Sequence, residues 1–146
     1  LFMRSAPYPM FTTFDSPRFN KTCTRRGRSN TPLQSLTMAN DQTTVEIARG
    51  FAALLLARSD LNDHQRLELA FRRSFARPPQ PFESERLMAY LQQQRIGFAV
   101  APKDAGALVG EPGNSGLPVE VEVAEGAAWI CVVRLLMNLD EFITRE

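Results

Sequence analysis

Apolar residues recur at intervals of three and four through the middle of the chain, the period of an α-helix with one buried face. The pattern predicts helices over about 43–58, from 62 or 63 to just before Pro78, and over about 82–98. Their apolar faces contain Val45, Ala48, Phe51, Ala52 and Leu55, then Leu67, Ala70, Phe71, Ser74 and Phe75, then Leu87, Met88, Leu91 and Phe98. Gly50 indicates a tight contact between helices. Arg95, with Gln92 and Gln93, lies off the apolar face, so we expect it in water.

A shorter helix before these is predicted from its N-terminal signals. Thr31 suits the N-cap, and Pro32 suits the first helical position. Gln34 follows Thr31 by the spacing of a capping box, in which each side chain accepts a hydrogen bond from the other residue's backbone N–H. Asn40 and Asp41 are expected to end this helix and cap the next one.

The last predicted helix, from about Ala127 to Leu139, is apolar nearly all round. A helix of this kind belongs in the centre of a bundle. Its apolar run is far shorter than the roughly 20 residues that a membrane span needs, and Arg134 interrupts it. We therefore expect a core helix and no membrane span.

Two segments lack a helical period. Residues 1–30 combine prolines with aromatic residues, and residues 101–126 are rich in Gly and Pro. Val119–Val123 alternates Val with Glu, and we favour a loop or the approach to the last helix over a short edge strand. The sequence thus predicts an all-α fold, a compact bundle of about five helices in a single domain with an irregular N-terminal arm. Its parts are the basic, aromatic arm (1–30), helices (31–100), an acidic loop (101–126), and a buried helix with a tail (127–146).

Charge is unevenly spread, although the net charge is only +1. Residues 1–30 carry a net charge of +5 and the remainder −4. The three arginines Arg25, Arg26 and Arg28 can serve an acidic partner such as nucleic acid, or pair within the molecule. We favour internal pairing, with the acidic loop or with carboxylates such as Glu46, Asp140 and Glu141.

The sequence contains no clear catalytic or metal-binding motif, so we assign no catalytic, cofactor-binding or metal residue. His64 is the only histidine, and we expect it to be solvated in the first turn of a helix. Asp140 and Glu141 directly follow the most apolar helix, but acids at helix ends commonly just contact water. Cys23 and Cys131 form neither CxxC nor CxxCH, which excludes a zinc knuckle or a c-type haem attachment made by such a motif. A disulfide between them stays open.

Three stretches resemble the C-terminal part of a bacterial family, the domain of unknown function 1553. They are FDSP at Phe14–Pro17, CTRRGRSNTPLQSLTMAND at Cys23–Asp41, and LMNLDEFITRE at Leu136–Glu146. The family is of planctomycete type and is often found in large proteins with a c-type cytochrome domain and a domain of unknown function 1549. No catalytic residue is established for it, so none is transferred.

The resemblance implies a multidomain protein, exported to the periplasm or cell surface, of which this chain is a fragment. The chain itself is then expected to hold no cofactor, while a haem elsewhere in the full-length protein stays open. The second and third stretches are the family's signature ends. They flank the bundle, so we predict that Arg25, Arg26 or Arg28 contacts Asp140 or Glu141.

Three functions follow from these observations. The favoured one is a non-catalytic structural or interaction module of a larger exported, cytochrome-associated bacterial protein, whose partners are other domains of the same polypeptide. The alternative is part of a catalytic domain, with polysaccharide as a candidate substrate, whose N-terminal half lies outside this chain. Nucleic-acid binding through the basic arm is the third and the least favoured.

Overall fold

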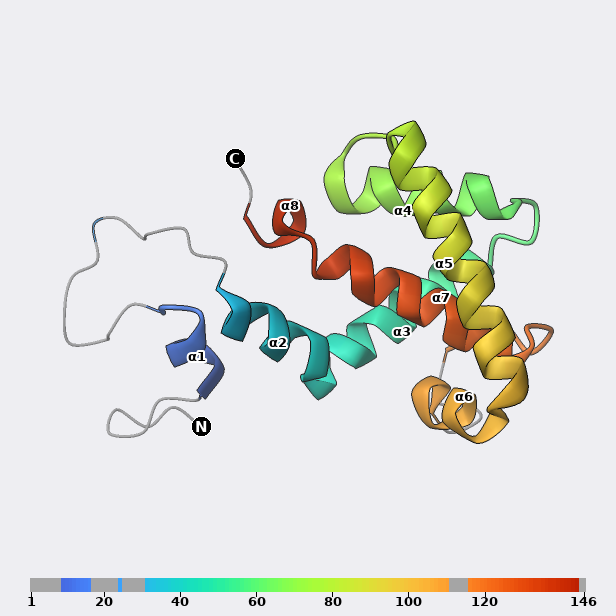
Figure 1. The fold of residues 1–146 in the computed structure, drawn as a ribbon, viewed down its shortest axis with the longest axis horizontal. Coiled ribbons are helices and arrows are strands. Elements are labelled where there is room, and N and C mark those ends of the chain that lie inside the picture. The colour runs from blue at the N-terminus through green and yellow to red at the C-terminus, as the bar shows by residue number, and fades with distance from the viewer. Residues whose placement is uncertain (1–8, 17–23, 25–30, 111–115, 145–146) are drawn as a thin grey trace.

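The computed structural model describes residues 9–16, 24, 31–110 and 116–144, and every regular element in these ranges is an α-helix (Figure 1). The predicted all-α class is therefore confirmed. The predicted number, about five, is too small. The helices are α1 (Pro9–Thr13), α2 (Pro32–Asn40), α3 (Gln42–Leu56), α4 (Asp63–Phe75), α5 (Pro81–Val100), α6 (Pro102–Val109), α7 (Val123–Met137) and α8 (Asp140–Ile143).

Helix α7 lies at the centre and packs against α3, α5 and α6 (Figure 1). Trp129, Ile130, Val133 and Leu136 are fully buried in it. The neighbouring helices contribute their own buried faces, with Ala48, Ala52, Leu55, Leu67, Phe71, Leu87, Leu91, Ala105 and Val109. No helix in the described part of the chain, α7 included, has the length and apolarity to cross a membrane. Apart from Val123 at its start, which is 49% exposed, the apolar residues of α7 are buried or partly buried in protein.

Local signals in the sequence set where several helices begin. The N–H of Thr31 donates to Oε1 of Gln34 at 2.9 Å, and the N–H of Gln34 donates to the Thr31 hydroxyl at 3.3 Å, which forms the capping box of α2. Asp41 caps α3 by accepting from the N–H of Thr43 at 2.9 Å. Asn62 and Gln65 form a second capping box at α4. Each cap satisfies backbone donors that have no partner inside the helix.

Two arginines donate hydrogen bonds to backbone carbonyl groups at the C-terminal ends of α6 and α2. Arg49 of α3 donates from Nε to the Leu108 carbonyl at 2.6 Å and from Nη2 to the Ala107 carbonyl at 3.2 Å. Arg134 of α7 donates from Nη2 to the Ala39 carbonyl. These acceptors lie in the last turns of α6 and α2, where carbonyl groups lack helical partners and the helix dipole favours a cation. The two arginines therefore tie α6 to α3 and α2 to α7.

The segment 101–126 is not the acidic loop that the sequence predicts, because it contains α6 and the start of α7. Pro102 occupies the first position of α6, where its missing N–H costs nothing and its ring presets φ. Ala105 and Val109, one turn apart, are buried against the core. The high Gly and Pro content of this segment is typical of a loop and conceals this short apolar face.

Other boundaries also differ from the prediction. The arm over 1–30 contains α1, which is too short to show a period, and α8 follows α7 directly. Val119–Val123 forms no strand; it leads into α7, which begins at Val123. The two short helices α1 and α8, with α6, account for the excess over five.

The tight glycine contact lies at Gly126 of α7 and not at Gly50 of α3. A Cβ placed on Gly50 would meet no atom within 4 Å, whereas one on Gly126 would lie 2.5 Å from Cδ1 of Leu117. The expectation for Gly50 was therefore wrong. Gly126 is buried, and its missing side chain is what allows Leu117 to pack over the first turns of α7.

We expect the two glycines to respond oppositely to alanine. Gly50→Ala should raise the free energy of unfolding by about 0.5–1 kcal/mol, because alanine has the better helix propensity and its methyl group meets open space. Gly126→Ala should lower it by about 1 kcal/mol, because overpacking outweighs the same gain in propensity. Urea unfolding measures both.

Leu117→Ala in the Gly126→Ala background is the matched control. Removing the Leu117 side chain makes room for the methyl group, so the two substitutions should be less destabilising together than their individual effects predict. Simple additivity would contradict the assigned contact.

Candidate functional site

The clearest concentration of charged groups lies where α4 ends and α8 begins. Helix α4 stops at Phe75, and Ala76 adopts the left-handed conformation, with φ of 58°. Arg77 follows, and it precedes Pro78 and Pro79, which disfavour helical backbone in the residue before each of them. The chain therefore turns sharply here and α5 starts at Pro81, which brings the side chain of Arg77 between α5 and α8.

Arg77 binds two carboxylates at once. Its Nε and Nη2 donate to Oε1 and Oε2 of Glu141 at 2.8 and 2.6 Å, and its Nη1 and Nη2 donate to Oε2 and Oε1 of Glu83 at 2.8 and 2.9 Å. The guanidinium carbon also lies 5.4 Å from the ring centroid of Phe71 and 5.7 Å from that of Phe75. Bidentate geometry and stacking on aromatic rings are what an arginine provides and a lysine does not.

These contacts hold both carboxyl groups in their charged form. Hydrogen bonds from Arg77, more than any other cause, lower the pKa of Glu83 and of Glu141. The hydrogen bonds to Glu83 and Glu141 in turn raise the pKa of Arg77. A general acid needs a carboxyl pKa raised towards neutral pH. The arrangement is therefore that of an ion-pair latch between α8 and the start of α5, and we refer to Arg77, Glu83 and Glu141 as the α8 latch.

An open hollow of about 680 Å³ lies beside the α8 latch. Its lining residues are Arg73, Ser74, Phe75, Ala76, Asp140, Glu141 and Thr144. The hydroxyl of Ser74 is buried and makes no hydrogen bond within the described residues. Hydroxyl, guanidinium and carboxylate groups together can bind a polar molecule, but Arg77 already holds both oxygens of Glu141. The hollow therefore presents no pair of carboxyl groups set up as acid and base.

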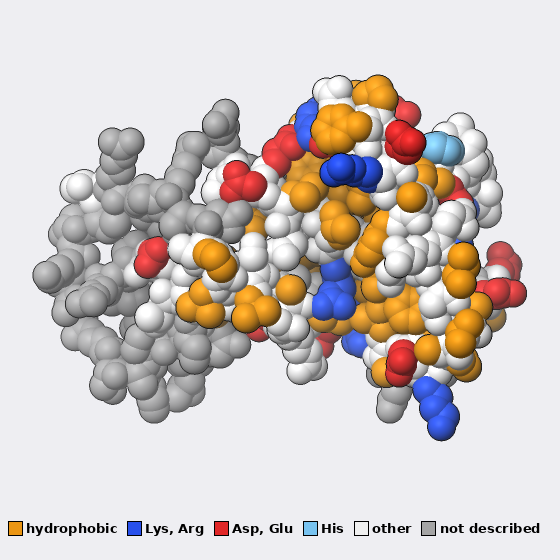
Figure 2. Space-filling model, viewed as in Figure 1, with side chains coloured by type: hydrophobic (Ala, Val, Ile, Leu, Met, Phe, Trp, Pro, Cys, Tyr) orange, Lys and Arg blue, Asp and Glu red, His pale blue; other side chains and the backbone are white. Residues whose placement is uncertain are grey.

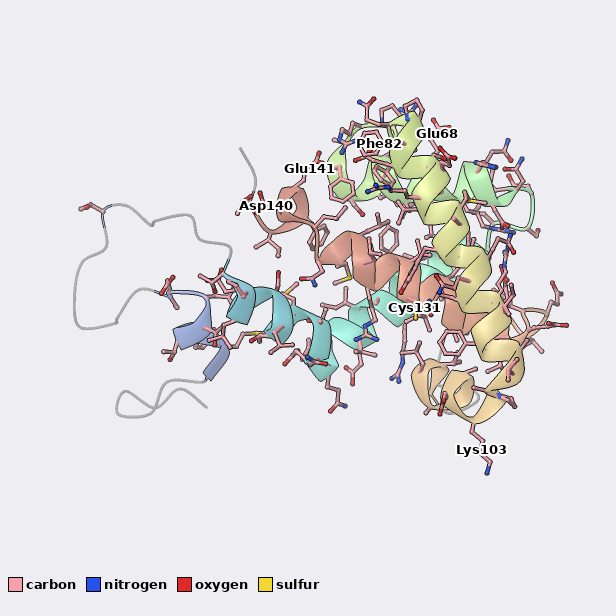
Figure 3. All side chains as sticks on the ribbon, in the orientation of Figure 1. Glu68, Phe82, Lys103, Cys131, Asp140 and Glu141 are labelled. Carbon is pink, nitrogen blue, oxygen red and sulfur yellow. The ribbon has the colours of Figure 1, made fainter. Side chains whose placement is uncertain are left out.

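The residues predicted as a site from the sequence are only partly placed. Asp140 and Glu141 open α8 at the edge of the hollow (Figure 3), and Glu141 pairs with Arg77. Arg25, Arg26 and Arg28 lie outside the described residues, so their contact with Asp140 or Glu141 stays a prediction. His64 is exposed at the other end of α4. The described residues contain no cluster of His, Cys, Asp and Glu that could hold a metal ion.

A second network links α4, α5 and α7, and it corrects the expectation that Arg95 is solvated. Arg95 donates from Nε and Nη2 to Glu125 at 2.6 and 2.5 Å, and from Nη1 to Asp63 at 2.8 Å. Glu125 also accepts from the indole N–H of Trp129 at 3.0 Å. All three charged side chains are about three-quarters buried. Arg95 is therefore a structural centre of the bundle.

Opposing effects set the pKa of Asp63 in this network. Burial raises the pKa of Asp63, but the hydrogen bond and charge of Arg95, together with Arg66, outweigh burial and lower it overall. Hydrogen bonds to Glu125 and Asp63 raise the pKa of Arg95 against the opposing effect of burial. Asp63 and Arg95 thus stabilise each other's charged form.

Cys131 of α7 has a free thiol in the structure, so it is not disulfide-bonded. Burial raises its pKa, with only partial compensation from Arg134 and from a hydrogen bond with Tyr90. A thiol with a raised pKa is a poor nucleophile and a poor metal ligand at neutral pH. Cys131 is therefore best described as a small, partly buried packing residue of α7.

Comparison with known proteins identifies a family and no further relative. A family model described as "Protein of unknown function (DUF1553)" matches residues 1–91, which is more than half of the chain. The match includes the FDSP and CTRRGRSNTPLQSLTMAND stretches and ends within α5. No curated protein and no solved structure matches the chain significantly.

Arg77→Met should weaken the α8 latch in a pH-dependent way. The pKa values of Glu83 and Glu141 are lowered in the folded state, so pairing stabilises the fold above the ordinary glutamate value of 4.5 and is lost as the pH falls through the folded-state values. The groups are partly exposed, so we expect a loss of about 0.5–1 kcal/mol per pair at pH 7. The variant and the wild type should converge near about pH 3 in urea unfolding.

Arg73→Met is the matched control, because Arg73 is the neighbouring exposed arginine on α4. It should keep the wild-type dependence of stability on pH. An unchanged pH profile in Arg77→Met would contradict the assignment of the latch.

Arg95→Met should be more costly, by about 2 kcal/mol at pH 7, because it leaves Asp63 and Glu125 largely buried without a cation. The penalty should shrink as acid protonates Asp63, whose pKa Arg95 lowers in the folded state. Trp129, the only tryptophan, reports locally, since its indole donates to Glu125. Its emission should shift in Arg95→Met and stay unchanged in Arg86→Met, which alters an exposed arginine of the same helix. Equal emission in the two variants would refute the network's role.

Proposed function

The chain belongs to the DUF1553 family of proteins of unknown function, and from that premise we propose that it is a non-catalytic structural or interaction module of a larger bacterial protein. The proposal takes from the family resemblance that this protein is exported and cytochrome-associated. It takes other domains of the same polypeptide as the partners. Support comes from the surface of the bundle, where aliphatic side chains gather outside the core.

The observation that carries the proposal is a hydrophobic surface on α2 and α3. Leu33 and Leu36 on α2, and Ile47 and Leu54 on α3, are each more than half exposed. The two helices follow each other along the chain and contact one another where they join (Figure 1), and Figure 2 shows hydrophobic side chains at the surface over α2. We call these four residues the α2–α3 surface. Rows of exposed aliphatic residues on a folded domain mark sites of interaction with protein.

Helix α3 explains why these residues are available. Its inward face, with Ala48, Ala52 and Leu55, is already occupied by the core. Ile47 and Leu54, separated by two turns, therefore point away from α7 and cannot contribute to the same core. A second protein surface is the natural partner for them, because burial of aliphatic area on both sides is favourable.

The hollow beside α8 is the one feature that favours the alternative, part of a catalytic domain. It offers Ser74 and Thr144 hydroxyl groups and the exposed acid Asp140. Against it, the α8 latch keeps Glu141 charged and bound, and His64 lies at the far end of α4. The charged groups near the hollow thus support attachment of α8 better than they support catalysis.

Leu36→Glu with Leu54→Glu tests the proposal. Both side chains are exposed in this chain, so we expect its free energy of unfolding to change by less than about 0.5 kcal/mol per substitution. In the full-length polypeptide the same pair should lower the melting temperature of this domain and raise hydrogen exchange across α2 and α3, because the charges prevent docking.

Lys103→Glu on α6 is the control, since it changes an exposed charge away from the α2–α3 surface (Figure 3). It should leave exchange across α2 and α3 unaltered in the full-length protein. Equal exchange on α2 and α3 in this chain alone and in the full-length wild type would show that nothing docks there, and would overturn the proposal.

A further inference from the structure

Helix α5 is apolar on two opposite faces, and only one of them belongs to the core. Leu87 and Leu91 are buried against the bundle. On the other side Phe82, Ile96 and Val100 are 61%, 69% and 83% exposed. A surface helix normally sets a polar face opposite its buried one. The outward face of α5 departs from this rule along most of the helix.

The outward residues lie in one line. Phe82, Ala89, Gln93, Ile96 and Val100 follow at intervals of seven, four, three and four residues, which keeps them on one side of an α-helix. We call these five residues the α5 stripe. Figure 2 shows hydrophobic side chains at the surface over α5, and Phe82 lies at the start of the helix in Figure 3.

The α5 stripe has few charges beside it. The exposed charged residues of α5 are Glu85 and Arg86, and both lie in its first half. Arg95, in the second half, is turned inward to Asp63 and Glu125. Depletion of charge around aliphatic and aromatic residues is the composition found at the centre of protein interfaces.

We propose that the α5 stripe binds the same stripe of a second copy of this chain, with the two helices antiparallel about a two-fold axis at Leu91. A two-fold interface must be self-complementary, because every contact between one residue of the first copy and another residue of the second is repeated with the two copies exchanged. Phe82 and Val100 are equidistant from Leu91 along the chain, and so are Ala89 and Gln93. The rotation therefore sets Phe82 of each copy on Val100 of the other, and Ala89 on Gln93. It sets Ile96 on the aliphatic part of the Arg86 side chain, whose charged end can remain in water.

Charge selects the antiparallel arrangement. In a parallel pair Glu85 would face Glu85, and Arg86 would face Arg86, so like charges would repel at the interface. In the antiparallel pair both residues lie opposite the second half of the other helix, where the outward residues are uncharged. Opposed like charges disfavour the wrong partner or register.

The size of the contact sets the expected affinity. Helix α5 has 20 residues and is thus about 30 Å long, so one helix pair forms an interface at the small end of specific complexes. We expect a reversible dimer with a dissociation constant of about 10–100 µM. The contact is mainly apolar, so the constant should change little with salt.

This inference goes beyond the proposed function, because the α2–α3 surface is a different part of the molecule. Docking of other domains can fail while the dimer persists, and the reverse also holds. Leu36→Glu with Leu54→Glu should leave dimerisation intact, and substitutions in the α5 stripe should leave docking at α2 and α3 intact.

Sedimentation equilibrium of the 146-residue chain, from low micromolar to millimolar concentration, measures the dimer directly. Ile96→Arg should weaken association at least tenfold, because in this register it faces Arg86 of the other copy and sets two cations against each other. Circular dichroism should show that the variant keeps its helices, since Ile96 is largely outside the core. A wild-type chain that stays monomeric over this range overturns the proposal.

A mixing experiment tests the register. Phe82→Lys and Val100→Glu should each weaken self-association, but an equimolar mixture should recover a heterodimer. In that heterodimer the introduced lysine faces the introduced glutamate at one end, and Phe82 faces Val100 at the other. Phe82→Lys mixed with Phe82→Glu is the control. It should associate no better than either variant alone, because antiparallel helices hold the two introduced charges at opposite ends of the interface.

Each remaining outcome decides against the assignment. A dimer that is indifferent to Ile96→Arg is formed by another surface. A mixture of Phe82→Lys and Val100→Glu that associates no better than either variant alone excludes the antiparallel register. Recovery in the control mixture would show that the introduced charges attract without register.

Discussion

The burial of α7 on all sides is the constraint on which the rest of the structure depends. Four consecutive residues of this helix, Ala127 to Ile130, are fully buried and together cover a complete turn, so other helices must surround it. At about 1.5–3 kcal/mol for each large side chain, its burial contributes on the order of 10 kcal/mol, comparable to the whole net stability of a typical domain. The family match covers α3, α4 and part of α5, whose inward faces rest on α7, a helix outside the match. The folding unit is therefore larger than the matched range.

Arginines link parts of the fold that the apolar core alone does not hold together. Arg49 and Arg134 bind carbonyl groups at helix ends, and Arg77 and Arg95 each bind two carboxylates from different parts of the chain. Each of these four guanidinium groups already binds acceptors within the bundle, so its charge stabilises the fold and is not directed at a ligand. What the molecule offers outward over α2, α3 and α5 is aliphatic surface. Burial, and not charge, is accordingly the means by which this module would recognise protein.

A feature of the fold could be predicted from the sequence when the residues that determine it lie close together in the chain. The capping box at Thr31 and the periods of α3, α4 and α5 are local, and local patterns predict them well. The residues that determine α6 also lie close together in the chain, but Gly106 and Pro102 are residues typical of a loop. The roles of Arg77 and Arg95 depend on glutamates that are far away in the chain, Glu141 and Glu125, and no spacing rule brings these together. A search for one apolar face per helix likewise overlooks the second face of α5.

The two ion-pair networks affect the outward apolar face of α5, because they fix both ends of this helix. Glu83, held by Arg77, neighbours Phe82 at the start of α5, and Arg95, held by Glu125 and Asp63, neighbours Ile96 near its end. Both ends of the helix are thus fixed to the bundle on the side opposite the α5 stripe. A surface that is already rigid loses less conformational entropy when it binds, and this gain in affinity requires no additional contact. The two ion-pair networks therefore act through geometry: they fix to the bundle the helix on which the exposed apolar residues are lined up.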